Sequence, residues 1–189
     1  MGEFRNGRLR DGVLEVVANP SRKDEAVLGV DPGLGTTGWG VIRVKDGNVR
    51  YVDSGRIKTY ATQPIGQRLD KIYRELQDVI QRHTITTCAV EAGFVGRSPL
   101  SSLQLGQARA AAVLAASTRN IPVECLSPRE VKMAITGKGS AAKGQVGYVV
   151  GKMLGLAFDE GEEDISDALA VALCHVSHSR SPFKLKAAR

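Results

Sequence analysis

The first part of the chain alternates between short apolar runs and turn residues, a pattern typical of β-strands. A run rich in β-branched residues covers 26–31, and we expect the ordered structure to begin there. A second run covers 39–44 and a third covers 49–57, and the Asp46-Gly47 pair between them is a strong hairpin signal. The pattern therefore predicts three consecutive strands that pair as a meander.

After this meander the hydrophobic period changes from two to that of a helix. Between 64 and 82, apolar residues recur every three or four positions, which predicts an amphipathic helix. A fourth strand is expected at 86–90, an alanine-rich helix at 98–118 and a fifth strand at 123–126. Helices therefore alternate with strands in this part of the chain.

Two more helices complete the predicted order. Ser127, Pro128 and Glu130 have the residue types and spacing of an N-cap, a first-turn proline and a capping-box glutamate. The last helix is expected at 164–175. The order strand-strand-strand-helix-strand-helix-strand-helix-helix predicts one α/β domain, a mixed sheet with helices on both faces.

Length and composition indicate one globular domain with a tail at each end. The 189 residues are 42% hydrophobic and 24% charged, as in an ordinary globular protein. We expect a poorly ordered N-terminal tail or extension at 1–26, one domain at 27–179 and a basic C-terminal tail at 180–189. The longest uncharged apolar stretch, 110–118, is too short for the ~20 residues of a membrane span, and the N-terminus lacks the apolar region of a secretory signal. These features predict a cytoplasmic protein with no membrane partner.

The distribution of charge along the chain narrows the range of possible functions. The net charge of +6 favours a polyanionic partner. Six acids and no base lie between 159 and 167, whereas five bases and one acid lie between 129 and 152. An acidic cluster beside a basic segment fits a metal-dependent enzyme that acts on phosphates, and it also fits a plain solvated surface.

A glycine motif follows the first predicted strand. Residues 33–38 read Gly-Leu-Gly-Thr-Thr-Gly, which matches the GxGxxG pattern of dinucleotide-binding proteins. That pattern requires a helix after the third glycine to hold the pyrophosphate, whereas 39–44 is strand-like. We therefore exclude a dinucleotide site. The P-loop pattern fails as well, because Gly137-Lys138 is followed by a glycine.

Four carboxylates stand at positions where catalytic groups often lie. Asp31 and Glu91 end the first and fourth predicted strands, and Asp164 and Asp167 share one face at the start of the last helix. Each has a structural alternative: a turn-forming aspartate, a solvated loop glutamate and a pair of helix-capping acids. Together they form an all-oxygen set without Cys or His, which Mg²⁺ and Mn²⁺ prefer. Two such ions can support phosphodiester hydrolysis.

Five segments, in order between about 27 and 178, carry a family resemblance. They are Val30-Asp31-Pro32-Gly33, 37–42 (Thr-Gly-Trp-Gly-Val-Ile), 105–109 (Leu-Gly-Gln-Ala-Arg), Gly137-Lys138-Gly139 and 164–170 (Asp-Ile-Ser-Asp-Ala-Leu-Ala). In this combination they resemble the RuvC family of bacterial crossover-junction (Holliday-junction) endonucleases. The resemblance implies a ribonuclease-H-like fold with a five-stranded sheet whose second strand is antiparallel. It also implies a homodimer that uses divalent metal to nick two strands of a four-way DNA junction symmetrically, in DNA recombination and repair.

The resemblance also implies roles for single residues. The four carboxylates would be catalytic and would bind two Mg²⁺ or Mn²⁺ ions: Asp31, Glu91, Asp164 and Asp167. Phe94 would probe unstacked bases at the junction, and its structural alternative is a core aromatic. Basic residues would contact the DNA: Arg97, Lys132, Lys138 and Lys143. The branch-migration proteins RuvA and RuvB would be functional partners.

The helices raise two further expectations. The leucines and alanines of 98–118 predict a dimer contact, because small residues allow a second copy to approach closely; alternatively, the alanines only fit this helix to its own sheet. A DNA-facing helix is expected around 144–155, where four glycines stand. Each interior glycine costs about 1 kcal/mol relative to alanine, so this helix is expected to be weak without DNA.

Two other functions fit the same residues at this stage. One is a ribonuclease-H-like nuclease for another substrate, such as RNA in a hybrid or a ribosomal precursor. The other is a non-catalytic junction-binding protein, which the four acids disfavour because a pure binder has no use for them beside a phosphate backbone. A sugar-kinase-like or actin-like phosphotransferase is excluded, since it needs two duplicated domains and the chain has no internal repeat.

Overall fold

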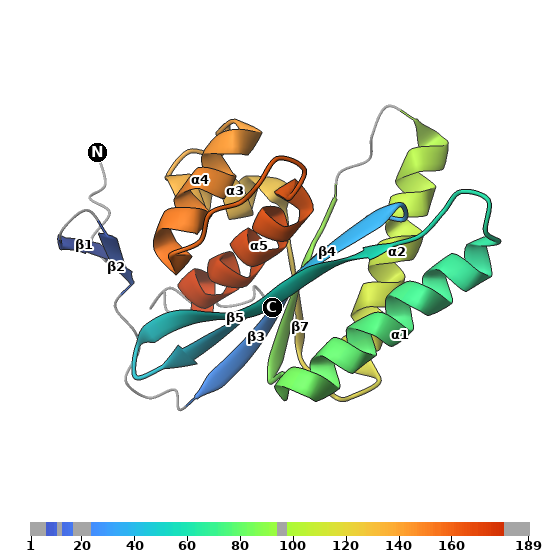
Figure 1. Cartoon of the computed structure of the whole chain (residues 1–189), viewed down its shortest axis with the longest axis horizontal. Coiled ribbons are helices and arrows are strands. Elements are labelled where there is room, and N and C mark those ends of the chain that lie inside the picture. The colour runs from blue at the N-terminus through green and yellow to red at the C-terminus, as the bar shows by residue number, and fades with distance from the viewer. Residues whose placement is uncertain (1–6, 11–12, 17–23, 94–97, 180–189) are drawn as a thin grey trace, which may run out of the picture.

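A five-stranded mixed sheet forms the centre of the molecule (Figure 1). The computed structural model describes residues 7–10, 13–16, 24–93 and 98–179. The strands of the sheet are β3 (Glu25–Asp31), β4 (Thr36–Lys45), β5 (Asn48–Lys58), β6 (Thr87–Glu91) and β7 (Val123–Leu126), in the spatial order β5-β4-β3-β6-β7. Strand β4 is antiparallel to both neighbours, whereas β3, β6 and β7 run parallel. This confirms the predicted α/β class and the antiparallel second strand.

Helices cover both faces of the sheet (Figure 1). The helices α1 (Ile65–His83) and α2 (Pro99–Ser117) lie on one face, and α3 (Pro128–Thr136), α4 (Lys143–Leu154) and α5 (Glu163–Ser179) lie on the other. Successive residues of β3 serve the two cores in turn: Leu28 and Val30 pack in the core with α1 and α2, and Val27 packs in the core with α5. The fully buried strand β3 is therefore apolar on both faces.

The local signals at turns and caps are confirmed. Asp46 and Gly47 both have positive φ, at 47° and 87°, as the tight hairpin turn between β4 and β5 requires. At α3, the Ser127 side chain accepts from the backbone N–H of Glu130, and the Glu130 side chain accepts from the backbone N–H of Ser127. The hairpin turn and the capping box were predictable because each spans only a few residues.

The predicted element order lacks one helix and a pair of short strands. The order drawn from hydrophobic periodicity omits α4, because three glycines interrupt its pattern, whereas the helix expected around 144–155 from the family resemblance is confirmed. It also assigns no strand within 1–26, where β1 (Gly7–Arg10) and β2 (Val13–Val16) form a separate two-stranded antiparallel sheet. Two of the α4 glycines face close neighbours: a Cβ on Gly147 would lie 3.2 Å from Ser166 Oγ, and one on Gly151 would lie 2.7 Å from the Leu156 carbonyl oxygen.

Helix α5 lies unusually close to the sheet, and glycines allow this approach. A Cβ on Gly29 of β3 would lie 2.1 Å from the carbonyl oxygen of Ala168, and one on Gly40 of β4 would lie 2.5 Å from Leu169 Cδ2. Side chains at either position would push the helix away. The position of α5 is therefore set by backbone contact with β3 and β4.

Candidate active site at the carboxyl ends of the strands

Asp31 and Glu91 lie side by side at one edge of the sheet. Val30 of β3 is the register partner of Val90 of β6, and each acid directly follows its valine. Side chains alternate along a strand, and Val27 and Ala89 pack in the core with α5, so Asp31 and Glu91 fall on the α5 side of the sheet. Both residues are half-buried. This is the edge at which ligands bind in open α/β sheets.

The start of α5 brings Asp164 to the same place. Asp31 pairs with Gly38 across β3 and β4. A Cβ on Gly38 would lie 2.0 Å from the carbonyl oxygen of Asp164 and 3.1 Å from its Cβ, so the first turn of α5 rests directly on this glycine. Asp167 follows three residues later on the same helix face, and both aspartates are half-buried. The ends of β3 and β6 and the first turn of α5 therefore lie together, and these three backbone segments carry the four predicted carboxylates.

The loop after Asp31 is tightly closed. Thr37, which is fully buried, donates its hydroxyl to the Gly33 carbonyl at 2.8 Å and accepts from the Gly33 N–H at 3.4 Å. A Cβ on Gly33 would lie 2.3 Å from the Thr36 carbonyl oxygen. The next element is β4 and not a helix, which agrees with the exclusion of a dinucleotide site. The glycines of this motif thus serve a strand-to-strand turn.

Arg68 of α1 supports this loop, a role that the sequence does not indicate. Its Nε donates to Thr59 Oγ1 at 2.8 Å and its Nη2 donates to the Leu34 carbonyl at 3.1 Å. The buried Thr59 hydroxyl also donates to the Leu34 carbonyl, and the Thr59 N–H donates to the Gly35 carbonyl. These bonds tie α1 and the end of β5 to the loop that follows Asp31. No sequence signal could reveal them, because the partners are 9 to 34 residues apart.

The donor set fits a hard divalent cation. All four side chains offer carboxylate oxygens, the ligands that Mg²⁺ and Mn²⁺ prefer. Among the described residues, no three Asp, Glu, His or Cys side chains are grouped so that they alone could hold a metal ion. Nucleases that bind Mg²⁺ need no such cage, because one or two carboxylates commonly share the ion with substrate phosphates and water. The site therefore suits an ion that is held jointly by the protein and a phosphate.

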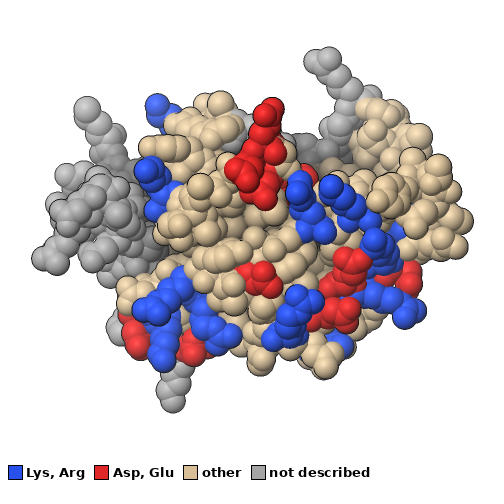
Figure 2. Space-filling view, in the orientation of Figure 1, with Lys and Arg blue, Asp and Glu red and all other residues tan. Residues whose placement is uncertain are grey.

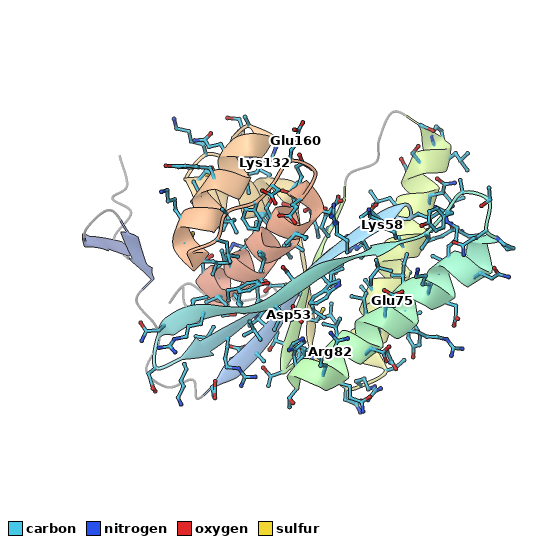
Figure 3. All side chains as sticks on the ribbon, in the orientation of Figure 1. Asp53, Lys58, Glu75, Arg82, Lys132 and Glu160 are labelled. Carbon is cyan, nitrogen blue, oxygen red and sulfur yellow. The ribbon has the colours of Figure 1, made fainter. Side chains whose placement is uncertain are left out.

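Of the predicted DNA-contacting residues, Lys132 and Lys138 have described side chains, and both lie at or just after α3. Lys132 of α3 is half-buried, and Lys138 is exposed in the loop after α3. Lys143 opens α4, and its side chain is not described. Phe94 and Arg97 lie outside the described residues. Figure 3 labels Lys132 and Glu160 on the layer of α3 to α5, and Figure 2 shows acidic side chains above the start of α5 with Lys and Arg side chains on both sides.

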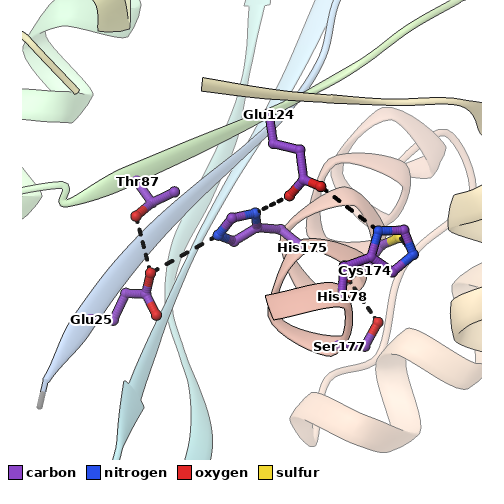
Figure 4. A network of polar contacts seen from close by, with 7 residues as sticks. All are labelled: Glu25, Thr87, Glu124, Cys174, His175, Ser177 and His178. Atoms are coloured by element: carbon purple, nitrogen blue, oxygen red, sulfur yellow. Dashed lines mark hydrogen bonds and ion pairs between the residues drawn. The ribbon is translucent and has the colours of Figure 1, made fainter. Parts of the chain in front are cut away.

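A second titratable cluster lies at the other end of α5 (Figure 4). The buried His175 donates through Nδ1 to Glu124 of β7, and its Nε2 lies 4.0 Å from Glu25 Oε1 of β3. Thr87 donates to Glu25 at 3.0 Å, and His178 Nδ1 lies 3.8 Å from Glu124 Oε1. Burial lowers the pKa of His175, but its contacts with Glu25 and Glu124 outweigh burial, so the pKa is raised above its ordinary value. The cluster links the end of α5 to β3, β6 and β7, and it lies at the starts of β3 and β6, whereas Asp31 and Glu91 end these strands.

This cluster predicts a pH-dependent stability. A raised folded-state pKa means that His175 contributes its full stabilisation below its ordinary pKa of 6.5, and that the contribution is lost as the pH rises through the folded-state value. We therefore expect the free energy of unfolding to fall between about pH 6 and about pH 9, and to fall less in His175→Gln. Urea unfolding at both pH values measures the difference. An equal fall in the two proteins would contradict the assignment.

Comparisons with known proteins identify the family of this chain. The sequence profile of the family described as crossover junction endodeoxyribonuclease RuvC matches residues 27–175. A protein of that name from Oleidesulfovibrio alaskensis is 42% identical over 82% of this chain and 92% of its own length, and one from Ehrlichia canis is 41% identical over 83% and 99%. The structure of T. thermophilus RuvC in complex with a Holliday junction substrate matches with a TM-score of 0.77 and 33% identity, over 82% of this chain and 95% of that one. None of the helices in the described ranges is long and apolar enough to cross a membrane.

Proposed function

Because the chain belongs to the RuvC family of crossover junction endodeoxyribonucleases, we propose that it resolves four-way DNA junctions by paired, symmetric hydrolysis of phosphodiester bonds at this site. One observation carries the assignment of the site. Asp31 and Glu91 end neighbouring parallel strands, and Asp164 rests on the glycine that pairs with Asp31. This arrangement supports the proposal, because carboxylates on rigid elements suit phosphoryl chemistry.

The carboxylates would hold Mg²⁺ or Mn²⁺, two ions in each site: Asp31, Glu91, Asp164 and Asp167. When bound, the ions supply activation of the attacking water and stabilisation of charge on the leaving oxygen. The strand ends orient Asp31 and Glu91, and the contact with Gly38 orients the first turn of α5. The N-terminus of α5 also contributes a partial positive charge beside the carboxylates and the phosphate. Without cations, four carboxylates would repel the DNA backbone.

The basic residues around the site would hold the DNA. Lys132, Lys138 and Lys143 would neutralise phosphates, and Arg97 would do so from the segment that follows Glu91. Phe94 in the same segment would stack on an unpaired base, a contact worth about 1–3 kcal/mol. RuvA and RuvB would act with the protein at the junction. Its DNA substrate would place it in the cytoplasm.

A homodimer would match the symmetry of the substrate, since a junction offers two strands to cut. The solvent face of α2 supports this proposal. Leu100, Leu103 and Leu114 are 63%, 60% and 53% exposed, and Gly106 and Ala110 are exposed between them. A Cβ on Gly106 would meet nothing within 4 Å inside the protomer, so a partner helix could approach this position closely. An apolar stripe of this kind is covered in most stable proteins.

We expect Leu100→Ser/Leu103→Ser to shift the protein from dimer to monomer. The change removes apolar area from the proposed interface and leaves the protomer core intact, because both side chains are mostly exposed. Sedimentation equilibrium at micromolar concentration measures the shift. Ile65→Ser on α1, which is 43% exposed, provides a control outside the stripe. A wild-type protein that stays monomeric with and without a junction, yet cleaves it, would contradict the dimer.

The function itself is tested on synthetic substrates. A four-way junction, a linear duplex and an RNA–DNA hybrid are each incubated with Mn²⁺, with Mg²⁺ and with chelator. We expect paired nicks at symmetric positions in the junction, only with metal. Preferential cleavage of the hybrid would favour a ribonuclease-H-like activity instead, and metal-independent binding without cleavage of any substrate would favour a pure junction-binding protein.

A further inference from the structure

The turn before α5 accepts a hydrogen bond from an arginine of the edge strand β5, the neighbour of β4. Arg56 of β5 donates through Nη1 to the carbonyl oxygen of Gly161 at 2.5 Å, a contact between residues 105 positions apart. Gly161 has a φ of +87°, a conformation that strongly favours glycine. Arg56 is half-buried.

The Gly161 carbonyl that Arg56 binds lies just before the first turn of α5 in the chain. The carbonyl oxygen of Glu162, the next residue, accepts from the N–H groups of Ile165 and Ser166 at 3.0 and 3.1 Å. The Glu162 side chain accepts from the Asp159 N–H at 3.1 Å and closes the turn. A displacement of Gly161 would therefore be passed to Asp164 through two covalently linked residues and two helical hydrogen bonds.

The sheet contacts the start of α5 as well. Arg56 is the register partner of Gly38 in the β4–β5 ladder, and Gly38 is the residue on which Asp164 rests. The first turn of α5 thus contacts the Gly38 backbone, and the turn just before it is bound by the Arg56 guanidinium. Figure 3 labels Glu160 in the turn before α5 and Lys58 at the end of β5.

The turn before α5 is rich in acidic residues. Asp159, Glu160, Glu162 and Glu163 all lie within five residues, beside Asp164. Their mutual repulsion would open the turn, and the positive charge of Arg56 opposes this. An arginine keeps its charge at all relevant pH values and reaches a carbonyl through a planar fork, so it suits a permanent support.

We propose that Arg56 is a positioning residue that acts through Gly161 to keep Asp164 and Asp167 in the geometry that binds the catalytic cations. The inference rests on the proposed function, because it assumes that these two aspartates are metal ligands. Arg56 need not touch DNA or metal. Its effect reaches the site through the backbone of the turn.

The test compares Arg56→Ala with Arg56→Lys and with the control Arg50→Ala, which removes the same charge from the exposed start of the same strand. Mn²⁺ binding to the DNA-free protein is measured from the electron paramagnetic resonance signal of free Mn²⁺. Cleavage of a four-way junction is measured against Mn²⁺ concentration, and junction affinity is measured in chelator. Hydrogen exchange of the 159–165 amides reports directly on the turn.

We expect Arg56→Ala to raise the Mn²⁺ concentration for half-maximal binding and cleavage about tenfold, the lower end of the effect of removing a residue that orients metal ligands. Exchange of the 159–165 amides should become faster, and junction affinity in chelator should change no more than in Arg50→Ala. Arg56→Lys should recover part of the metal affinity, because an ammonium can still donate to the carbonyl.

Two results would overturn the inference: Mn²⁺ binding like that of Arg50→Ala, or a loss of junction affinity in chelator with Mn²⁺ binding unchanged, which would make Arg56 a DNA contact. Asp167→Asn separates this failure from failure of the proposed site. If Asp167→Asn loses Mn²⁺ binding and cleavage while Arg56→Ala does not, the site stands and only the role of Arg56 fails. If Asp167→Asn binds Mn²⁺ and cleaves as the wild type does, both fail.

Discussion

Asp31→Asn and Asp167→Asn are expected to abolish junction cleavage while junction binding persists. Each substitution keeps the size of the side chain and removes the charge that would hold a cation. A lost metal interaction worth about 4 kcal/mol or more in the transition state corresponds to at least about a 10³-fold slower reaction. Binding should persist, because the removal of a negative charge beside a phosphate backbone does not weaken electrostatic attraction.

The measurement is the single-turnover cleavage rate of a four-way junction at saturating Mn²⁺, together with junction affinity in chelator. Asp78→Asn is the matched control, because Asp78 is an exposed acid on α1, outside the proposed site. It should cleave at the wild-type rate. Wild-type rates in Asp31→Asn or Asp167→Asn would remove the two-ion assignment, whereas a joint loss of binding and folding would indicate a structural role.

The sequence predicted the parts of this site that depend on local patterns. Asp31 and Glu91 were found because an acid that ends an apolar run marks the carboxyl end of a strand. The start of α3 was found because the capping box spans only three residues. Helix α4 was expected only from the family resemblance and not from periodicity, because Gly147 and Gly151 lie close to Ser166 and Leu156, and no local pattern records such contacts.

The supports of the site could not be predicted in the same way. In the sequence, Gly38 stands out only as part of a glycine motif. Its contact with Asp164 joins residues that are 126 positions apart. Arg68 and Arg56 likewise act on carbonyl groups 34 and 105 positions away. Chemistry-bearing residues therefore follow from strand ends and helix starts, whereas the residues that hold them follow only from packing in three dimensions.

Gly38→Ala is expected to reduce both stability and cleavage, because it adds a methyl group where α5 touches the sheet. The new Cβ would lie 2.0 Å from the Asp164 carbonyl oxygen, far inside van der Waals contact. Overpacking of this kind typically costs about 1–3 kcal/mol of unfolding free energy. The helix can relieve the clash only by moving its first turn away from β4. Asp164 and Asp167 would move with it, and a shift of about 1 Å can slow a reaction about 10²-fold.

Gly35→Ala is the matched control for this experiment. Gly35 lies three residues earlier, directly before β4, and a Cβ there would meet nothing within 4 Å. Its unfolding free energy should stay within about 0.5 kcal/mol of the wild type, with an unchanged cleavage rate. Urea unfolding and single-turnover cleavage distinguish the two variants. If Gly38→Ala matched Gly35→Ala in both measurements, α5 would not be positioned by its contact with Gly38. If Gly38→Ala lost stability but kept its cleavage rate, the contact would hold the fold without orienting the carboxylates.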